Sequence, residues 1–496
     1  MGNCLTHTPA HAPGCISAAT RRHALSAAEG VARARRAGGT VLIVTMWILI
    51  VLAGLVLVLA RAMRAEGDRA ANSMAAVQAT AVQEGAIQYV LSCVDGLEGQ
   101  TPSDADTPCE AIRVGDGTFW ILRPGDDERT YSFGITDEGG KLNLNTATLD
   151  MLSRLPGMTP EFAASIIDWR DPDSNITADG AESEYYLMLP EPPAGRSPAA
   201  GEGPYECSNA PLETVEELFL VRGATTDILY GRDANRNGII DAGENDRVFT
   251  VSSGAGGSRL DRGILGFVTI YGGEVAAATA TTGAAPAVTI NVNDAPPPVL
   301  IVFLRNYVSS DRLPGVFSRT LSGRPFRNVL DFYYRAGLTI DEFKKMANRV
   351  TTSRTKPPGL INVNTAPREV LLCLPGLDDG DASALISART GANTDLTNIA
   401  WVAEALSREK AIAIGGYITA VSYFFSADIV SVGPTGRAFK RCRVVIDARS
   451  SPPKVIYRQN LTHLGWPLAS DIIARLRAGL PLETVSQTVS GGIGQP

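Results

Sequence analysis

Hydrophobic residues follow two successive patterns in the first hundred residues of the chain. Val41 to Ala60 form a run of 20 residues without a charge, and a helix needs about that length to cross a bilayer. The stretch that follows, to Val94, is rich in Ala, Gln and Glu and contains no Pro, which favours continued helix. Together they predict one helix of about 50 residues. Its predicted packed face contains Val77, Ala81, Ile87, Val90 and Leu91.

Alternating apolar and polar residues then predict strands. Segments of this kind occupy 117–124, 129–145, 416–432, 437–449 and 453–466. The last three indicate a β-meander that completes a sheet begun before Asn145. We therefore expect residues 146–410 to form an insertion within one domain.

A phrase of the sequence occurs twice. "GKLNLNTATLDMLSRLPGM" starts at Gly140 and "GLINVNTAPREVLLCLPGL" at Gly359, an offset of 219 residues. Each copy predicts a short strand, a threonine cap (Thr146 or Thr365), and two helices joined by a Pro-Gly turn. The residues that define the motif are Asn143, Asn145, Thr146, Pro156 and Gly157 in the first copy, and Asn362, Asn364, Thr365, Pro375 and Gly376 in the second.

A third, degraded copy begins at Thr289 with "TINVNDAPPPVLIVFL". Asp294 replaces the threonine and is also a possible cap, while the three prolines that follow predict a late start for any helix. Helix-hairpin-helix units often bind DNA, but the second glycine of the DNA-binding turn is missing here. Asp378 and Asp379 follow the second turn and would repel phosphate. A protein-packing role is therefore favoured, and a membrane-anchored DNA-binding or DNA-uptake protein is the alternative.

Composition narrows the possible functions. The chain of 496 residues is 45% hydrophobic and 20% charged, which is typical of globular domains. Its net charge of −7 argues against nucleic acid as the main partner. Three of the four histidines precede the apolar run, and neither a G-x-S-x-G turn nor a phosphate-binding loop occurs. We expect no catalytic residues and no enzyme activity; an anchored hydrolase that uses His463 is a weaker rival.

The N-terminal flank of the apolar run carries the first family resemblance. "RRAGGTVLIVTMWIL" resembles the leader of type IV pilin-like proteins, which a prepilin peptidase cuts after glycine. The resemblance implies a cut after Gly39 that leaves Thr40 as the new N-terminus. The family's usual glutamate at the fifth mature position is replaced by Val44. The arginines before the run predict a cytoplasmic N-terminus, and an uncleaved signal anchor is the alternative.

Further motifs extend the resemblance over most of the chain. The leader, "DEGGKLNLNTA", "IIDWRDPD", "GAESEYY" and "INVNTAP" together resemble protein K, a minor pseudopilin of type II secretion systems. The resemblance implies a single-pass inner-membrane protein with most of its chain in the periplasm, which caps the tip of a pseudopilus and helps protein export across the outer membrane. The implied partners are other minor pseudopilins, inner-membrane secretion components and prepilin peptidase, with no nucleic acid. The stretch 230–355 makes this chain longer than typical members.

The resemblance also implies an α+β fold. A long transmembrane and amphipathic helix packs on an antiparallel pilin-like sheet that carries a large, mostly helical insertion of SAM-like or helix-hairpin-helix units. The expected parts are a leader (1–39), a transmembrane helix (40–61), the first pilin-like part (62–145), the inserted domain (146–358), the second helix-hairpin-helix (359–410), the β-meander (411–470) and a flexible tail (471–496).

Two acidic segments are candidate calcium sites. "DANRNGIIDAGE" fits the EF-hand loop at every ligand position, with Asp233, Asn235, Asn237, Ile239, Asp241 and Glu244 as ligands and Gly238 at the turn. A weaker candidate combines Asp168, Asp171, Asp173 and Glu182, in the inserted domain where the resemblance implies calcium. The alternatives are an Asx-rich turn for the first and a solvated acidic loop for the second.

Cysteine usage leaves one pairing open. Seven cysteines are present, and Cys93 and Cys109 flank a Pro/Asp-rich loop. In an oxidising compartment these two could form a disulfide; the alternative is a pair of free, buried thiols.

Overall fold

The computed structural model describes residues 27–125, 130–191, 201, 203–241, 244, 262–272, 289–353 and 359–480, with backbone only before Val41. The chain divides into two compact units, Met1–Asn72 and Ser73–Pro496. Helix α1 (Ala27–Val94) contains 68 residues and is longer than predicted because it begins before the apolar run. Within the described residues, one helix is long and apolar enough to cross a membrane, and its most apolar window has a mean hydropathy of 3.1.

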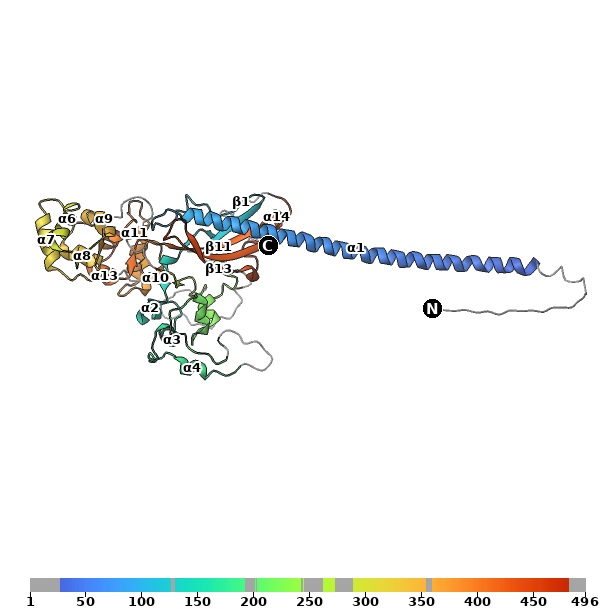
Figure 1. The fold of residues 1–496 in the computed structure, drawn as a ribbon, viewed down its shortest axis with the longest axis horizontal. Helices are drawn as coiled ribbons and strands as arrows, with labels where there is room; N and C mark the ends of the chain where they lie inside the picture. Colours follow the sequence, from blue (N-terminus) through green and yellow to red (C-terminus); the bar gives the residue numbers. More distant parts are fainter. Residues whose placement is uncertain are drawn as a thin grey trace, which may run out of the picture. The chain divides into compact units, whose positions relative to one another are not determined.

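The sheet of the second unit combines strands from both ends of the sequence. Its order is β1-β2-β11-β12-β13, with β3 beside β2 and β4 beside β11, and every pair is antiparallel. The strands are β1 (Ile112–Val114), β2 (Gly117–Arg123), β3 (Ser132–Phe133), β4 (Thr136–Asp137), β11 (Phe424–Val432), β12 (Phe439–Asp447) and β13 (Lys454–Asn460). Because β2 pairs directly with β11, the long segment between them leaves the sheet and returns to it (Figure 1).

The two faces of the sheet have different cores. Phe119 and Ile121 of β2 pack with Val82, Ala86 and Val90 of α1 on one face, whereas the alternate residues Trp120 and Leu122 pack with Leu468 and Ile472 on the other. This alternation follows from the period of two in a strand. The second side is covered by α14 (Ser470–Arg477) and the segment before it.

The predicted packed face of α1 is correct only in part. Ile87 and Val90 are buried, but Val77 is 64% exposed and Ala81 is also exposed. The buried row instead begins at Ala75 and Ala79, where the hydroxyl of Ser431 donates to the Ala79 carbonyl over 2.9 Å. Small side chains allow the sheet to approach the helix closely at these positions, and this contact fixes the rotation of the helix.

The segment between β4 and β11 is mostly helical. It contains η1 (Glu138–Gly140), α2 (Leu149–Ser153), α3 (Pro160–Arg170), α4 (Ser183–Leu187), η2 (Val215–Leu220), α5 (Thr226–Tyr230), α6 (Pro297–Arg305), α7 (Leu313–Ser322), α8 (Val329–Ala336), α9 (Ile340–Met346), η3 (Ala347–Arg349), α10 (Arg368–Cys373), α11 (Asp379–Arg389), η4 (Ile399–Trp401), α12 (Val402–Ala405) and α13 (Arg408–Ile414). A further short turn, η5 (Thr462–Leu464), follows β13. The structure combines a long apolar helix, a set of shorter helices and an antiparallel sheet, which confirms the predicted α+β class.

Three short parallel ladders organise the helical segment. β5 (Leu142–Asn143) pairs with β6 (Val268–Thr269), β7 (Ile290–Asn291) with β8 (Val350–Thr351), and β9 (Ile361–Asn362) with β10 (Ile418–Thr419). The strands predicted over 129–145 and 416–432 are therefore each divided. Their ends nearest the insertion belong to a ladder of a repeated unit, because Asn143 pairs with Thr269 and Thr419 pairs with Asn362, both outside the main sheet.

The third copy of the repeat also forms a helix. α6 begins at Pro297 with Pro296 at its N-cap, so the prediction of a late start is wrong. The prolines occupy the first turn, where backbone N–H groups have no partner within the helix and proline is tolerated.

Candidate metal centre

The asparagines of the repeated motif bind backbone groups. Asn143 and Asn362 each accept a hydrogen bond from the amide two residues later, at 2.9 and 3.1 Å. Asn145 donates to the Leu212 carbonyl at 3.0 Å and accepts from the Leu212 amide at 2.8 Å. Asn364 donates to the carbonyls of Leu396 and Ala420 at 2.7 and 3.1 Å. These side chains join each strand to segments far away in the sequence, so their role is structural.

The caps predicted from the motif are shifted. α2 is capped by Thr148, whose hydroxyl accepts from the Met151 amide, and Pro367 stands at the cap of α10. Thr146 and Asp294 are therefore not caps, because the chain makes an extra turn between strand and helix. Thr365 instead donates from its hydroxyl to Asp137 at 2.6 Å.

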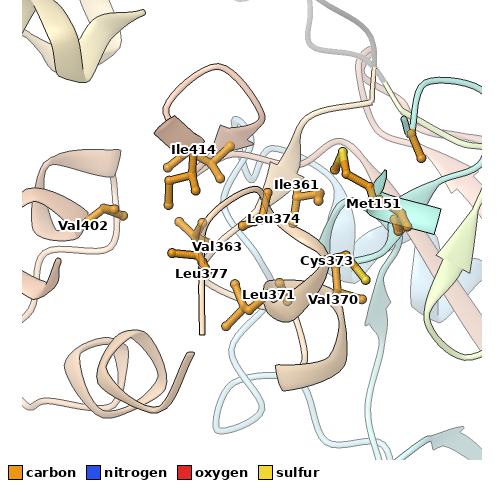
Figure 2. Packing of buried hydrophobic residues seen from close by; sticks show 14 of the residues in the cluster. Met151, Ile361, Val363, Val370, Leu371, Cys373, Leu374, Leu377, Val402 and Ile414 are labelled. Carbon is orange, nitrogen blue, oxygen red and sulfur yellow. The ribbon is translucent and has the colours of Figure 1, made fainter. Parts of the chain in front are cut away.

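The Pro-Gly turns lie where the sequence predicts them. Gly157 and Gly376 have φ values of 67° and 76°, a left-handed conformation that favours glycine. Pro156 and Pro375 precede them in the connections from α2 to α3 and from α10 to α11. The helix pair of the second copy packs around Val370, Leu371 and Leu374, with Met151 of the first copy beside it (Figure 2).

Two arginines complete the motif and were not predicted. Arg170, at the end of α3, donates to the carbonyls of Leu144 and Ala147. Arg389, at the end of α11, donates to those of Val363 and Ala366, the latter at 2.6 Å. Extending the comparison of the two copies beyond their Pro-Gly turns would have found this pair, because the offset of 219 residues also separates the two arginines.

The weaker calcium candidate contains two buried carboxylates, Asp168 and Glu182, whereas Asp171 is half-buried and Asp173 is exposed. Asp168 lies on α3, Asp171 follows that helix and Glu182 stands at the N-cap of α4. Asp168 and Glu182 are almost fully buried, at 0% and 3% exposure. One oxygen of Asp168 accepts from the Thr177 amide at 3.0 Å, whereas its other oxygen, one oxygen of Asp171 and both oxygens of Glu182 have no hydrogen-bond partner.

The electrostatics of this group favour a bound cation. The pKa of Glu182 is raised by burial and then by Asp168, Asp171 and Asp173. The pKa of Asp171 is also raised by burial and by Asp173 and Asp168, although Arg170 lowers it. Buried carboxylates that repel one another without a cation are costly, and a hard divalent cation prefers oxygen ligands of this kind.

Two further features of the site lie outside the predicted ligands. Asn209 donates to the Asp173 carbonyl at 3.2 Å, and its own side-chain oxygen is buried without a partner. A Cβ on Gly180 would lie 2.0 Å from the second Asp168 oxygen, so only glycine allows the chain to approach this carboxylate. Asp173 caps its own turn, accepting from the Asn175 amide at 2.8 Å.

The carboxylates do not form a closed cage. In the part of the chain that the structure describes, no group of three or more His, Cys, Asp or Glu side chains is placed to hold a metal ion. The unpartnered oxygens of Asp168, Asp171, Glu182 and Asn209 nevertheless fit a calcium ion in their chemistry. A cation would supply the partners that these oxygens lack.

The EF-like loop is satisfied by its own backbone. Asp233 accepts from the amides of Asn237 and Gly238 at 3.0 and 2.9 Å. Glu244 accepts from the amides of Ala234, Asn235 and Asp241 at 2.9, 3.3 and 3.1 Å. The side-chain amides of Asn235 and Asn237 both donate to Asp241, and the Ile239 amide donates to the Asn237 side chain. These carboxylates already accept hydrogen bonds from the chain, whereas both oxygens of Glu182 and one oxygen each of Asp168 and Asp171 have no such partner.

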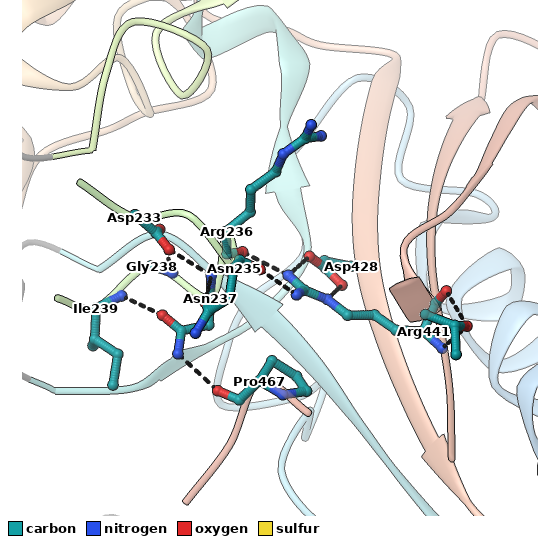
Figure 3. Close-up of polar contacts among 10 residues, drawn as sticks. Asp233, Asn235, Arg236, Asn237, Gly238, Ile239, Asp428, Arg441 and Pro467 are labelled. Carbon is teal, nitrogen blue, oxygen red and sulfur yellow. Dashed lines mark hydrogen bonds and ion pairs between the residues drawn. The ribbon is translucent and has the colours of Figure 1, made fainter. Parts of the chain in front are cut away.

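The same loop is fastened to the sheet. Arg441 of β12, which is fully buried, donates to the carbonyls of Asn235 and Arg236 and pairs with Asp428 of β11 (Figure 3). Asn237 donates to the Pro467 carbonyl at 2.8 Å. Burial, with a smaller contribution from Glu244, raises the pKa of Asp233 to about 6. Gly238 has a φ of 86°, which explains glycine at the sixth position of the loop.

The remaining sequence predictions concern processing and cysteines. Gly39 and Thr40 lie within α1. Cys93 is half-buried and Cys109 is buried, and both are free thiols in the structure, in agreement with the alternative of unpaired cysteines.

Comparison with known families tests the resemblance to protein K against the alternative of a DNA-binding protein. Residues 141–230 match the first of two family models for type II secretion system protein K, and residues 361–410 match the second. Two segments of the chain therefore resemble protein K of type II secretion systems. The resemblance carried by the repeated motif is thereby confirmed, and the protein is a minor pseudopilin of type II secretion.

The protein K matches separate the two calcium candidates. The first match contains Asp168, Asp171, Asp173 and Glu182, whereas the EF-like loop and the third copy of the repeat lie between the two matches. A solved structure described as the GspK-GspI-GspJ complex from the enterotoxigenic Escherichia coli type 2 secretion system is similar at 13% identity and a TM-score of 0.36, covering 77% of this chain and 95% of that chain. No curated protein matches the chain.

Proposed function

We propose that this pseudopilin caps the tip of a periplasmic pseudopilus and so helps proteins to cross the outer membrane. The observation that carries the proposal is the combination of Val44 in the apolar half of α1 with a large segment inserted between β4 and β11. Its work is recognition and assembly rather than a chemical reaction.

Val44 supports a position at the end of the fibre. A carboxylate in the bilayer is tolerated only where a cation neutralises it. In pilin-like fibres that cation is the N-terminal amine of a neighbouring subunit, so a subunit without the carboxylate needs no neighbour on that side. The bulk of the SAM-like inserted domain, residues 146–358, also suits an end rather than a shaft of closely stacked helices.

The anchor gives the proposal its first test. We propose that the chain crosses the inner membrane once, with a cytoplasmic N-terminus, and that prepilin peptidase cuts after Gly39. After co-expression with the peptidase, sequencing of the mature N-terminus should begin at Thr40. A Gly39→Val variant should stay uncut, whereas Gly38→Val serves as the control. An uncut wild-type chain, or a cut on the outer side of the helix, would refute the assignment.

The proposed partners are other minor pseudopilins and inner-membrane components of the secretion system. The resemblance to protein K supports them, as does the apolar, uncharged first half of α1, which can pack with other transmembrane helices. Co-purification of the detergent-extracted chain with the other minor pseudopilins should yield a complex. Replacing Val44 with Glu should move the chain into internal positions or reduce secretion. Unchanged secretion and unchanged assembly with this variant would argue against the tip.

We further propose that the carboxylate group of Asp168, Asp171, Asp173 and Glu182 binds calcium. A bound ion would supply the missing partners of the buried oxygens and hold α4 against the end of α3. Calcium at 100 times its dissociation constant should stabilise the chain by about 2.7 kcal/mol. Glu182→Gln should remove this gain in thermal unfolding, while Glu184→Gln, an exposed neighbour on α4, should keep it. A calcium effect that survives Glu182→Gln would place the ion elsewhere.

The EF-like loop is a second proposed calcium site, with Asp233, Asn235, Asn237, Ile239, Asp241 and Glu244 as ligands. Glu244→Gln should lower the melting temperature only in the presence of calcium. An equal loss in calcium and in chelator would identify the loop as a structural turn.

A further inference from the structure

The helices α2, α6 and α10 occupy equivalent places in the three copies of the repeat. Each follows a buried strand residue, Leu144, Val292 or Val363. Seven residues after this position the copies carry Met151, Val299 and Val370. Ten residues after it they carry Arg154, Val302 and Cys373. These positions can therefore be compared directly.

In the first and second copies the apolar positions of this face are covered by the other copy, whereas Arg154 at the ten-residue position of α2 is exposed. α2 and α10 contact each other, and Met151, Val370 and Cys373 are buried at 5%, 0% and 0% exposure. Figure 2 shows Met151 beside Val370 and Cys373. The repeat thus uses this helix face to pack against another helix.

In the third copy the same face is open. Val299 and Val302 are 52% and 60% exposed, although Leu300 and Leu304 on the opposite side of α6 are fully buried. Arg305 is exposed and follows Val302 at the spacing that places residues on one helix face. The face is therefore an apolar stripe with a cation at its C-terminal end.

The third copy, which carries the stripe, has an excess of positively charged residues. Residues 289–353 contain nine Lys and Arg against five Asp and Glu, in a chain whose net charge is −7. Arg305, Arg327, Lys345 and Arg349 are exposed and form no ion pair with the residues that the structure describes. Cations that no internal acid neutralises are available to an acidic partner.

We propose that Val299, Val302 and Arg305 form a docking surface for an amphipathic helix of a partner protein. The partner's helix presents a narrow apolar stripe that ends in a carboxylate opposite Arg305. The packing of α2 on α10 supplies the geometry, and the charge of the third unit supplies the chemistry. A second copy of this chain fits poorly, because a two-fold contact through α6 would bring the same positive unit against itself.

The surface can be tested in the full-length chain in its own cells. A photo-crosslinking amino acid at position 302 should give an adduct with one other protein, attached within an acidic amphipathic segment. The same amino acid at Ile176, which is 61% exposed in another part of the chain, should not give this adduct. Arg305→Glu should lower the adduct yield about tenfold, and reversing the partner's acidic residue should restore it. Arg113→Glu, at an exposed arginine of β1, is the matched control.

The outcomes that would overturn the proposal are distinct. The first is an adduct with the wrong molecule, which means a second copy, nucleic acid or another segment of this chain. The second is an adduct whose yield does not change with Arg305→Glu. The third is the absence of any adduct. Because the substituted side chains are exposed, the variants should keep the wild-type melting temperature. Val302→Asp provides a second disruption if Arg305→Glu alters the fold. The result does not depend on calcium or on the position at the tip.

Discussion

Glu138 is the buried charge on which the joint between sheet and insertion depends. Its side chain is 1% exposed and lies 2.5 Å from Lys141 Nζ and 2.9 Å from Arg443 Nη2. The hydroxyls of Ser426 and Thr269 also donate to it, each at 2.6 Å. The perturbation we consider is the removal of one partner at a time, with Glu138→Gln and Lys141→Met.

The pKa values indicate how the two substitutions differ. Burial alone would raise the pKa of Glu138, but Lys141 and Arg443 outweigh it and lower the pKa from 4.5 to about 2, which stabilises the folded state by about 3 kcal/mol. Burial lowers the pKa of Lys141 from 10.5 to about 8 despite its attraction to Glu138, a cost of about 3 kcal/mol. The two shifts act in opposite directions, so the pair adds less stability than the Glu138 shift alone indicates.

Removing one partner has unequal consequences. Glu138→Gln leaves the buried ammonium of Lys141 without its counter-ion and should destabilise the fold by about 3–5 kcal/mol. Lys141→Met removes the desolvation cost while Arg443 still neutralises Glu138, so its effect should stay within about 1 kcal/mol. Thermal unfolding of the full-length chain in detergent at pH 7 should therefore show a melting temperature lowered by about 6–10 °C for Glu138→Gln only.

The pH dependence gives an independent check. The stabilisation from Glu138 is present above its unfolded pKa and should be lost as pH falls from 4.5 towards about 2. The cost from Lys141 should disappear as pH rises from about 8 to 10.5. Glu138→Gln should lack the acid loss, and Lys141→Met the alkaline gain. Equal destabilisation by both substitutions at pH 7 would refute the reasoning.

Three further predictions concern the repeat, the carboxylate group and the EF-like loop. Arg389→Met should destabilise the second repeat by about 2–3 kcal/mol in denaturant unfolding, because the Val363 and Ala366 carbonyls lose a charged donor. The control is Arg408→Met, at an exposed position of α13, which should have no comparable effect. Gly180→Ala should abolish calcium stabilisation measured by thermal unfolding, because the new methyl group displaces Asp168; retained calcium response would show that Asp168 is not a ligand. Arg441→Met should release the EF-like loop from the sheet, and faster amide exchange at Asn237 and Gly238 than in wild type would detect it.

The sequence predicted the elements better than their contacts. The apolar run, the alternating strands and the duplicated phrase each reflect a local periodicity, and the strands appear near the expected positions. The rotation of α1 was predicted incorrectly because Ala75 and Ala79 are buried by their small size rather than by hydrophobicity. The true caps were missed because Thr146 and Thr148 are equally suitable by residue type, and only the backbone path selects one.

The two calcium candidates also show that the sequence predicts residue types better than their contacts. The EF-like spacing is a strong pattern in sequence, yet Asp233 and Glu244 accept hydrogen bonds from backbone amides and Asp241 accepts them from the side chains of Asn235 and Asn237. The acidic residues around Asp168 form a weaker pattern, but burial leaves their oxygens without partners. Burial of this kind depends on how α3, α4 and the chain near Asn209 are packed, which residue spacing does not reveal.

The ladder of β7 and β8 has a consequence for how this chain could gain its length. These strands begin and end the third repeated unit, and they lie side by side, paired at Ile290 with Val350 and Asn291 with Thr351. The unit therefore leaves and re-enters the rest of the chain at nearly one point, about 5 Å apart. A segment whose two ends lie next to each other can be inserted or deleted with only a short connecting peptide. The sheet and the other two repeated units would then keep their own strand pairings.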